Sequence, residues 1–286
     1  MALRRAAMTF DWGKKTYVMG IVNVTPDSFS GDGLTDAAAA IERGVQMETG
    51  GADMLDVGGE STRPGSTPLP LEKELDRVIP VVHALAKRVR IPISIDTYKS
   101  EVARRAIESG AGIINDVWGG RMDPDILKVA AEKQVPIILM HNRSQPRNAE
   151  QSEQLGGRYV GMEYGDLMME DIKKELRQSI DAALAAGVVR ENIVVDPGIG
   201  FGKTVEQNLE LIRRFVELKS LRYPILVGPS RKSFVGYTLN LPPHERLEGT
   251  IAATTLCIEK GADIVRVHDV KEIYRVARFV DAVVRS

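Results

Sequence analysis

The sequence has a single cysteine and no apolar run that approaches the length of a membrane span. Cys257 cannot form a disulfide within the chain, which is typical of a reducing compartment, and its apolar helical surroundings predict a core position. Residues 1–12 include two arginines but lack the apolar stretch of a secretory signal. These absences predict a cytoplasmic protein that has no membrane partner.

An excess of charge of one sign is also missing. The 38 basic and 39 acidic side chains give a formal net charge of -1. No global field is available to recruit nucleic acid, so no nucleic-acid partner is expected, and any anion has to be bound by a local cluster. The length of 286 residues fits two small domains or one domain of barrel size.

Three segments repeat one local pattern, in which a glycine precedes a short apolar run with a polar sixth residue. The segments begin at Gly51, Gly110 and Gly261, and their sixth residues are Asp56, Asn115 and Arg266. Each segment follows a helical pattern, so the glycine is expected to end a helix and the apolar letters to form a strand. The pattern is that of repeated helix-to-strand units.

Five further apolar runs complete a set of eight predicted strands: 17–22, 91–95, 135–140, 193–195 and 224–227. Helix-length segments separate the runs, and Val102, Ala106 and Ile107 show the expected amphipathic spacing in one of them. Eight alternating strand–helix units predict an α/β fold, a TIM (β/α)8 barrel that forms a single domain over residues 1–286. Residues 1–16 are interpreted as an N-terminal extension. A doubly wound open sheet is the alternative fold.

Polar residues stand at the predicted carboxyl ends of these strands, where the active sites of such barrels lie. They are Asn23, Asp56, Asp96, Asn115, His141, Asp196, Ser230 to Lys232, Arg266 and His268. We expect them to form one ring that faces one cavity. Two carboxylates and a carboxamide in this ring, at 96, 196 and 115, suit a flat heterocycle with N–H donors along one edge, because carboxylates only accept hydrogen bonds.

A basic group suited to a highly charged anion consists of four side chains: Arg63, Lys232, Arg266 and His268. Lys232 follows Ser230, where a short helix is expected to begin. Positive charge there opposes the helix dipole, so a functional role is favoured over a structural one. A lone histidine is often structural, but His268 stands two residues after Arg266, so both side chains are expected to point the same way.

Residues 193–203, I-V-V-D-P-G-I-G-F-G-K, place Asp196 at the end of a strand and beside a loop with three glycines. Glycine allows the backbone to turn tightly and to approach a ligand closely. A cap of the following turn is the structural alternative for Asp196. A phosphate loop is rejected, because three residues separate Gly198 from the Gly202-Lys203 pair, whereas the Walker pattern has four.

Six stretches in register resemble the successive motifs of the bacterial dihydropteroate synthase family. They read NVTPDSFS from Asn23, ESTRPG from Glu60, SIDT from Ser94, DPGIGFGK from Asp196, SRKS from Ser230 and RVHDV from Arg266. Each motif alone is weak, but six in one order are specific. The resemblance extends from about Tyr17 to the C-terminus.

The resemblance implies a folate-pathway transferase that joins 6-hydroxymethyl-7,8-dihydropterin pyrophosphate to p-aminobenzoate. The implied pterin pocket comprises Asp96, Asn115, Met140, Asp196, Gly228 and Lys232. The implied pyrophosphate site comprises Asn23, Arg63, Arg266 and His268, with Asn23 as the protein ligand of a Mg²⁺ ion. The implied p-aminobenzoate site comprises Phe29, Thr62, Pro64, Phe201, Lys232 and Ser233. The implied catalytic residues are Asp96, Asp196, Lys232, Arg266 and His268.

A dissociative mechanism, as in the family, fits these residue types, since the sequence shows no nucleophile–base pair. Asp96 and Asp196 suit a cation that forms on the pterin, and the basic group suits the leaving pyrophosphate. Two segments depart from the family pattern. The first loop has Asp32 one position later than expected, and the segment after His141 reads Asn142-Arg143-Ser144 in place of Met-Arg-Gly. Residues 142–161 form a long polar connection without an assigned role.

Three other functions are alternatives. A folate-dependent corrinoid methyltransferase or a non-catalytic pterin-binding module leaves Arg63, Arg266 and His268 unexplained. An aldolase with Lys232 as its Schiff-base amine leaves the acidic residues unexplained. The resemblance also implies a homodimer that pairs through its last helices. One face of the last helix is apolar, at Ile273, Val276, Ala277, Val280, Val283 and Val284.

Overall fold

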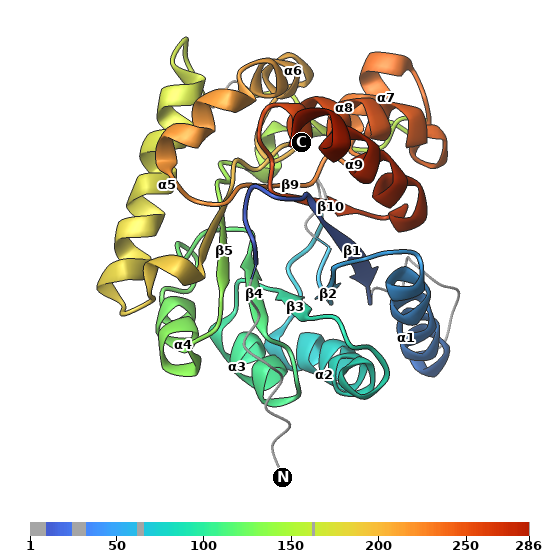
Figure 1. Ribbon diagram of the computed structural model, residues 1–286, viewed down its shortest axis with the longest axis vertical. Helices are drawn as coiled ribbons and strands as arrows, with labels where there is room; N and C mark the ends of the chain where they lie inside the picture. The colour runs from blue at the N-terminus through green and yellow to red at the C-terminus, as the bar shows by residue number, and fades with distance from the viewer. Residues whose placement is uncertain (1–9, 25–32, 62–65, 162–163, 286) are drawn as a thin grey trace.

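Eight parallel strands form the central sheet in a computed structural model that describes residues 10–24, 33–61, 66–161 and 164–285 (Figure 1). The order across the sheet is β8-β5-β4-β3-β2-β1-β10-β9. Their bounds are β1 Tyr17–Asn23, β2 Met54–Gly58, β3 Ile93–Asp96, β4 Ile113–Asp116, β5 Ile137–Met140, β8 Ile193–Asp196, β9 Leu226–Val227 and β10 Ile264–Val267. All eight predicted strands are confirmed.

The two outer strands of this order, β8 and β9, meet and close the sheet into a barrel. Val195 of β8 forms a parallel bridge to Ile225, and its N–H donates to the carbonyl oxygen of Pro224 at 2.9 Å. Closure satisfies backbone groups that an open edge would leave unpaired. The predicted TIM barrel is therefore confirmed, and the doubly wound open sheet is wrong.

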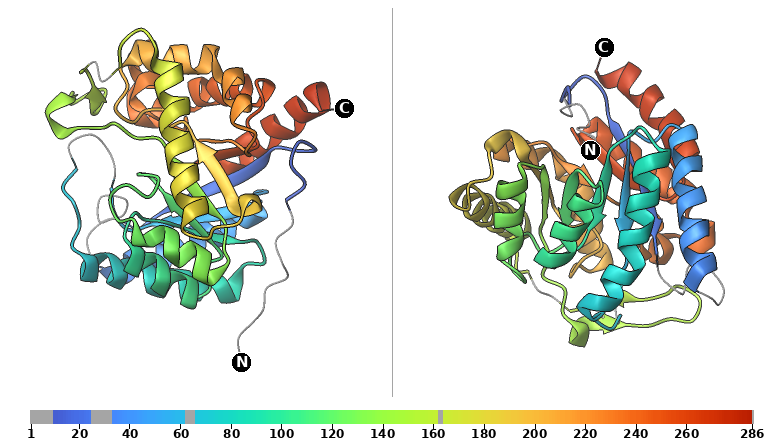
Figure 2. Two further views of the ribbon diagram at one scale, coloured as in Figure 1. Left: turned by 90° about the vertical axis from the view of Figure 1, so that its left-hand side faces the viewer. Right: turned by 90° about the horizontal axis from the view of Figure 1, so that it is seen from below.

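Helices cover the outside of the barrel (Figures 1 and 2). They are α1 Gly33–Thr49, α2 Leu71–Arg88, α3 Ser100–Glu108, α4 Asp125–Lys133, α5 Met168–Ala185, α6 Val205–Arg213, α7 Ser233–Leu239, α8 Leu247–Glu259 and α9 Val270–Val284. Short 3₁₀ segments span Pro146–Asn148, Arg190–Asn192, Phe215–Leu221 and Pro243–Glu245. None of the helices in the described ranges is long and apolar enough to cross a membrane.

The predicted ends of three helices are confirmed, and the predicted start of one helix is wrong. Gly51, Gly110 and Gly261 have φ values of +102°, +116° and +101°, so they end helices as predicted. The short helix α7 begins at Ser233 rather than at the predicted Ser230. The cause is Arg231, whose φ of +55° is left-handed and incompatible with a continuous helix before Ser233.

Two hydrophobic cores hold the barrel together. The larger core packs the outer face of the sheet against the helices and includes the buried Cys257, as predicted. The smaller core fills the barrel interior, and Phe10 and Trp12 pack against it. On α9, Val283 is 65% exposed, so the predicted apolar face continues beyond the part that packs on the barrel.

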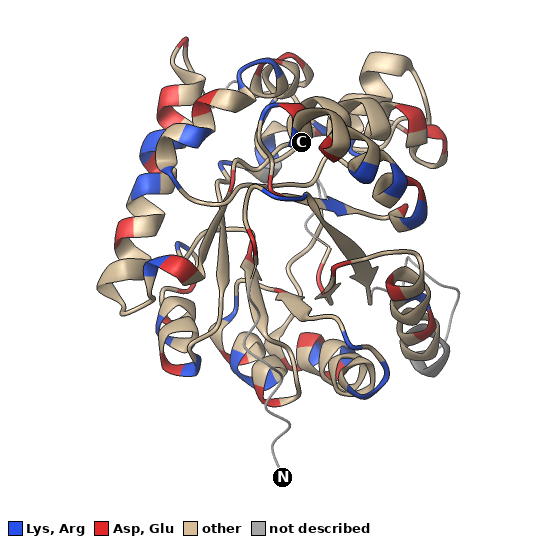
Figure 3. Ribbon diagram, in the orientation of Figure 1, with Lys and Arg blue, Asp and Glu red and all other residues tan. Residues whose placement is uncertain are grey.

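The connection from β5 to α5 contains a small hairpin, β6 Ala149–Glu150 and β7 Arg158–Tyr159, which projects from one end of the barrel (Figure 2). The sequence predicted only a polar loop here. Positions of acidic and basic residues are interspersed along the outer helices, as expected for a net charge near zero (Figure 3).

Candidate active site

The carboxyl end of the barrel interior is polar because side chains alternate along each strand. Residues two apart on a strand point to the same side. The interior core contains Met54, Ile113, Val194 and Ile264. The residues two positions further along those strands are Asp56, Asn115, Asp196 and Arg266, which places these polar groups above the apolar interior layer.

Arg266 joins a buried carboxylate, Asp56, and a partly buried one, Asp96, at this end of the barrel. Its Nε donates to Oδ2 of Asp56 at 2.6 Å, and its Nη2 donates to Oδ2 of Asp96 at 2.6 Å. Nδ2 of Asn115 donates to the same Asp56 oxygen at 2.9 Å. The predicted pterin-pocket residues at 96 and 115 are therefore brought together with Arg266, which had been predicted to hold pyrophosphate.

Asp56 is the link in this group that the sequence did not assign a role. It lies within β2 rather than at its end, it is fully buried, and its Oδ1 has no partner among the described residues. Its position in the glycine-led repeat was the available signal. The sequence could not indicate the hydrogen bonds of Asp56 to Asn115 and Arg266, since these partners lie on other strands, β4 and β10.

Burial changes the acidity of both predicted catalytic carboxyls. Burial raises the pKa of Asp96 to about 7, and the nearby charge of Asp56 adds to this, while Arg266 acts in the opposite direction. Burial also raises the pKa of Asp196, while the Lys232 ammonium and the Gly198 N–H lower it. These two carboxyls respond to any new positive charge in the pocket, because a cation favours their ionised form.

Asp196 also caps the turn that follows β8. Its Oδ1 accepts a hydrogen bond from the N–H of Gly198 at 2.7 Å, so the structural alternative predicted for this residue is correct. A carboxylate has two oxygens with several acceptor sites. The cap therefore leaves Asp196 with acceptor capacity towards the barrel interior.

The glycine loop 198–202 makes its close approaches to the protein itself. Its three glycines have φ between +58° and +80°, which confirms the predicted tight turn. A Cβ on Gly198 would collide with the carbonyl oxygen of His141, and one on Gly202 would lie 2.6 Å from the backbone of Arg143. A Cβ on Gly200 would collide with the stem of Lys232. Packing against the protein is sufficient to require these glycines.

Lys232 extends across the glycine loop. Its Nζ donates to the carbonyl oxygen of Ile199 and lies 4.1 Å from the centroid of the Phe201 ring. Burial lowers the pKa of Lys232 to about 7, although Asp196 acts in the opposite direction. Ser233 follows at the first position of α7. Lys232, Phe201 and Ser233, three of the residues predicted to bind p-aminobenzoate, therefore lie together.

His268 follows β10 and is fixed by the SRKS motif. The Oγ of Ser230 lies 3.0 Å from its Nδ1 and accepts a hydrogen bond from its backbone N–H at 3.1 Å. Arg231 pairs with Asp269, with Nε 2.8 Å from Oδ2. Asn23 ends the adjacent strand β1 and is partly exposed, so the predicted pyrophosphate residues at 23, 266 and 268 come from neighbouring strands.

Three further predicted residues, Met140, His141 and Gly228, lie at or directly after the ends of strands. Met140 ends β5 and is buried, and Gly228 follows β9 within 3.5 Å of the Arg266 side chain, measured from its ideal Cβ position. The prediction that His141 belongs to the ring is wrong, because its Nε2 lies 3.1 Å from Glu175 of α5, outside the barrel. His141 directly follows the inward-facing Met140, so alternation turns it outward.

Four predicted site residues, Phe29, Thr62, Arg63 and Pro64, and the displaced Asp32 lie outside the described residues.

The base of the second loop is described. Lys99 Nζ lies 2.6 Å from Oε2 of Glu60, 2.7 Å from the carbonyl oxygen of Leu69 and 2.5 Å from Oε2 of Glu74. Lys99 therefore fastens both ends of the loop that carries ESTRPG, a role that no sequence pattern indicated.

The β6–β7 hairpin is fastened to the same end of the barrel. Arg246, which is buried, donates to the carbonyl oxygens of Leu155 at 2.7 Å and Arg231 at 3.0 Å. The hydroxyl of Tyr237 donates to the carbonyl oxygen of Gly156 at 3.1 Å. The connection 142–161 thus supports the turn that carries Lys232.

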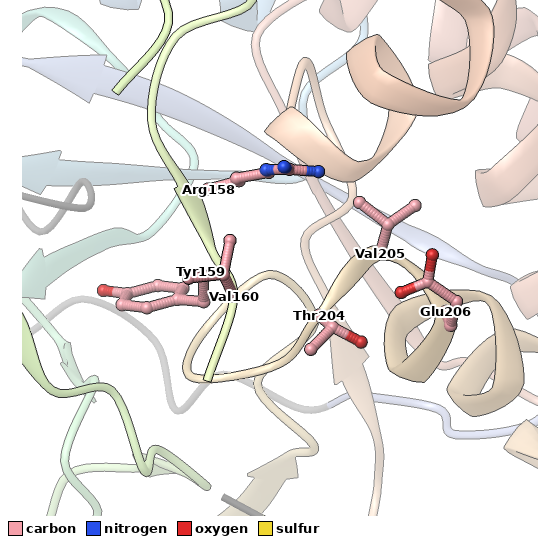
Figure 4. A pocket seen from close by; sticks show the side chains of 6 residues that line it. All are labelled: Arg158, Tyr159, Val160, Thr204, Val205 and Glu206. Atoms are coloured by element: carbon pink, nitrogen blue, oxygen red, sulfur yellow. The ribbon is translucent and has the colours of Figure 1, made fainter. Parts of the chain in front are cut away.

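Two cavities are lined by described residues of the outer connections and helices. A cavity of about 220 Å³ between the hairpin and the start of α6 contains none of the predicted site residues (Figure 4). Its lining residues are Arg158, Tyr159, Val160, Thr204, Val205 and Glu206. A larger cavity of about 600 Å³ between α1 and α9 includes His268 in its lining.

Comparison with known proteins identifies the family. Residues 19–268 match the pterin binding enzyme family. A dihydropteroate synthase of Clostridium beijerinckii is 50% identical over 278 residues, covering 96% of this chain and 97% of that protein. The crystal structure of the Clostridium difficile dihydropteroate synthase in the presence of pteroic acid has a TM-score of 0.89 and 48% identity, over 97% of this chain and 100% of that chain. A Xanthomonas albilineans dihydropteroate synthase with 4-aminobenzoic acid has a TM-score of 0.85 and 40% identity, over 95% and 94% of the two chains. The chain therefore belongs to the pterin-binding enzyme family, among its dihydropteroate synthases.

Proposed function

We propose that this dihydropteroate synthase releases pyrophosphate from its pterin substrate before the amine attacks. The chain is a transferase that condenses 6-hydroxymethyl-7,8-dihydropterin pyrophosphate with p-aminobenzoate, giving 7,8-dihydropteroate and pyrophosphate. In the proposed order, the C–O bond breaks and both its electrons leave with pyrophosphate. The amine nitrogen then bonds to the cationic carbon and loses a proton.

The observation that carries this proposal is the pair of carboxyls at the ends of β3 and β8, of which Asp96 is partly buried and Asp196 is buried. Asp96 and Asp196 both lie at the polar end of the barrel, where charge interactions are stronger than in water. A cation on the dihydropterin favours their ionised form, and fixed negative charge stabilises it in return. Asn115 offers both a donor and an acceptor for the edge of the heterocycle.

Arg266 and His268 are placed to stabilise the leaving pyrophosphate. Arg266 already has two carboxylate partners, so its charge is held in position before substrate arrives. His268 is oriented by Ser230. Arg63 completes this proposed group, although it lies outside the described residues.

Asn23 is the proposed protein ligand of Mg²⁺. The described residues contain no group of three or more His, Cys, Asp or Glu side chains able to hold a metal ion. A single amide oxygen fits an ion that is held mostly by phosphate oxygens and water, and Asn23 is partly exposed at the end of β1. When bound, Mg²⁺ supplies positive charge that offsets the charge of the departing pyrophosphate.

Lys232, Phe201 and Ser233 are the described part of the proposed p-aminobenzoate site. Lys232 lies over the Phe201 ring, and its charge interacts with that of Asp196, so it is placed to contact both substrates. The amine nucleophile is neutral in solution, so the second step needs no strong general base. Phe29, Thr62 and Pro64 are the remaining proposed residues.

A homodimer through α8 and α9 is also proposed. Leu256 is 48% exposed, Phe279 is 73% exposed and Val283 is 65% exposed on these two packed helices. Exposed apolar side chains that cluster on neighbouring helices are typical of a protein interface. A cytoplasmic location is proposed from the single cysteine, which is buried and free.

The alternatives receive less support from the site. A corrinoid methyltransferase has no pyrophosphate to hold, and the comparisons reported above are with synthases. An aldolase needs Lys232 as a free amine, whereas the Nζ of Lys232 donates a hydrogen bond to the Ile199 carbonyl. An aldolase reaction also gives the two aspartates, Asp96 and Asp196, no role.

Positional isotope exchange tests the proposed order of steps. The substrate carries ¹⁸O in the bridge between the pterin methylene and phosphorus, and the enzyme is supplied with Mg²⁺ but no p-aminobenzoate. Reversible release lets the terminal phosphoryl oxygens rotate before the bond re-forms, so the label is expected to move to non-bridging positions. A label that stays in the bridge while condensation is active would favour direct displacement.

A further inference from the structure

Lys203 directly follows the glycine loop 198–202, is 2% exposed and has no part in the proposed chemistry. Its ammonium faces three acceptors within hydrogen-bond distance. They are the carbonyl oxygens of Gly198 at 2.9 Å and Phe201 at 3.2 Å, and the Nδ1 of His141 at 3.4 Å. A lysine ammonium has three N–H donors. The number of acceptors matches the protonated side chain.

Two of these acceptors belong to the glycine loop, which Lys232 also contacts. Lys232 donates to the Ile199 carbonyl and lies over the Phe201 ring, and its stem packs against Gly200. Lys203 bonds the carbonyls on either side of that segment, at 198 and 201. The loop is therefore held by two lysines, one buried in the fold and one in the site.

The third acceptor fixes the inner lysine to the scaffold. For Nδ1 of His141 to accept a hydrogen bond from Lys203, the ring proton has to be on Nε2, which lies 3.1 Å from Oε2 of Glu175. Burial and the Lys203 charge lower the pKa of His141 to about 3, which keeps the ring neutral. Glu175 in turn pairs with Nε of Arg143 at 2.8 Å. The chain of contacts thus runs from the loop to α5.

We propose that Lys203 is a positioning residue for p-aminobenzoate, because its ammonium holds residues 198–202 in the conformation that presents Ile199 and Phe201 to Lys232. This inference rests on the proposed function only in taking Lys232 and Phe201 as contacts of that substrate. It assigns Lys203 no contact with either substrate. Its effect on the reaction passes through the loop.

The environment of Lys203 makes its protonation part of this role. Burial lowers its pKa to about 7, with Lys232 and Arg143 acting in the same direction and Asp196 and Glu175 opposing them. The other titratable groups that face it are His141 and the hydroxyl-bearing ring of Tyr164. Loss of one proton leaves two donors for three acceptors, so the loop is held less firmly as the pH rises through this range.

Steady-state kinetics of Lys203→Met and Lys203→Ala test the proposal. The KM for p-aminobenzoate is expected to rise about tenfold or more, since a charged hydrogen-bond donor is lost, whereas the KM for the pterin pyrophosphate stays within about threefold. Propylammonium is expected to restore the p-aminobenzoate KM of Lys203→Ala, whose cavity admits it, but not that of Lys203→Met. An unchanged p-aminobenzoate KM, or equal rises in both KM values, would overturn the inference.

A second measurement uses the unmodified protein, in case both variants fail to fold. The pKa of the Lys203 ammonium is followed by ¹⁵N NMR in the free enzyme, with a pterin and with 7,8-dihydropteroate. Since a protonated Lys203 favours the bound loop, dihydropteroate is expected to raise this pKa more than the pterin does. Equal values in all three states would contradict the proposal. The outcome is independent of the order of bond breaking, so failure of the dissociative mechanism is separately visible in isotope exchange.

Discussion

The Nη2 of Arg266 lies 2.6 Å from the Oδ2 of Asp96, so the cation on β10 is paired with the carboxyl at the end of β3. The same guanidinium pairs with Asp56, which is fully buried. One arginine is thus shared by Asp96 of the proposed pterin pocket and by Asp56 beneath it in β2. Removal of either Asp56 or Arg266 changes the charge that Asp96 experiences, in opposite directions.

The acidic limb of the pH–activity profile tests this arrangement. Asp96 has to be ionised to stabilise a cation, and burial raises its pKa to about 7, so kcat/KM is expected to fall as the pH drops through that value. Asp56→Asn removes a negative neighbour and is expected to move the limb to lower pH. Arg266→Gln removes a positive neighbour and is expected to move it to higher pH, each by roughly one unit. Shifts of the same sign would contradict the assignment of this limb to Asp96.

A pair of glycine substitutions tests why the glycine loop has its composition. Gly198→Ala is expected to destabilise the fold by at least about 3 kcal/mol, because its Cβ collides with the His141 carbonyl at a left-handed φ of +68°. Gly156→Ala is the matched control, since its φ is +71° and no atom lies within 4 Å of its Cβ position. The control should cost about 1 kcal/mol. Equal losses in urea denaturation would show that backbone strain, not packing, requires Gly198.

Loss of Arg246 tests the support that the β6–β7 hairpin gives to the site. Arg246→Leu leaves the carbonyls of Leu155 and Arg231 without their buried donor, which should cost about 2–4 kcal/mol of stability. Because Arg231 precedes Lys232, kcat/KM is also expected to fall at temperatures where the variant remains folded. The exposed Arg213→Leu is the control and should leave both quantities unchanged. Full activity of folded Arg246→Leu would separate the hairpin from the site.

The proposed dimer face is tested by sedimentation velocity at micromolar concentration. Phe279→Glu places a charge at the most exposed of the three apolar side chains of the proposed α8–α9 face, and is expected to give a monomer. Val189→Glu alters a side chain that is 55% exposed elsewhere and should leave the dimer intact. A wild-type protein that sediments only as a monomer would remove the proposal.

Much of the barrel could be predicted because its signals are local. A parallel strand buried on both faces reads as a short apolar run, and a glycine with positive φ marks the helix end before it, as at Gly110. Alternation along a strand then places Asp96, Asn115 and Asp196 on the inner side. The start of α7 could not be predicted, because its sequence does not reveal the left-handed conformation of Arg231.

Partners across the barrel could not be predicted, because they are distant in the chain. Arg266 and Asp96 are 170 positions apart, and Arg246 is 91 positions from Leu155. His141 is polar and directly follows a strand, so it was predicted to belong to the ring. Because side chains alternate along a strand, it faces α5 instead. Lys203 looked like part of a phosphate loop, and its three acceptors become visible only when the loop is folded.

Pyrophosphate release is the measurement that tests the central claim most directly. The wild type and Asp96→Ala are each supplied with 6-hydroxymethyl-7,8-dihydropterin pyrophosphate and Mg²⁺, with and without p-aminobenzoate. We predict slow release from the wild type without the amine, faster release with dihydropteroate formation when it is added, and loss of both in Asp96→Ala. Release that strictly requires the amine, or that is independent of Asp96, would contradict a cation stabilised by this carboxylate.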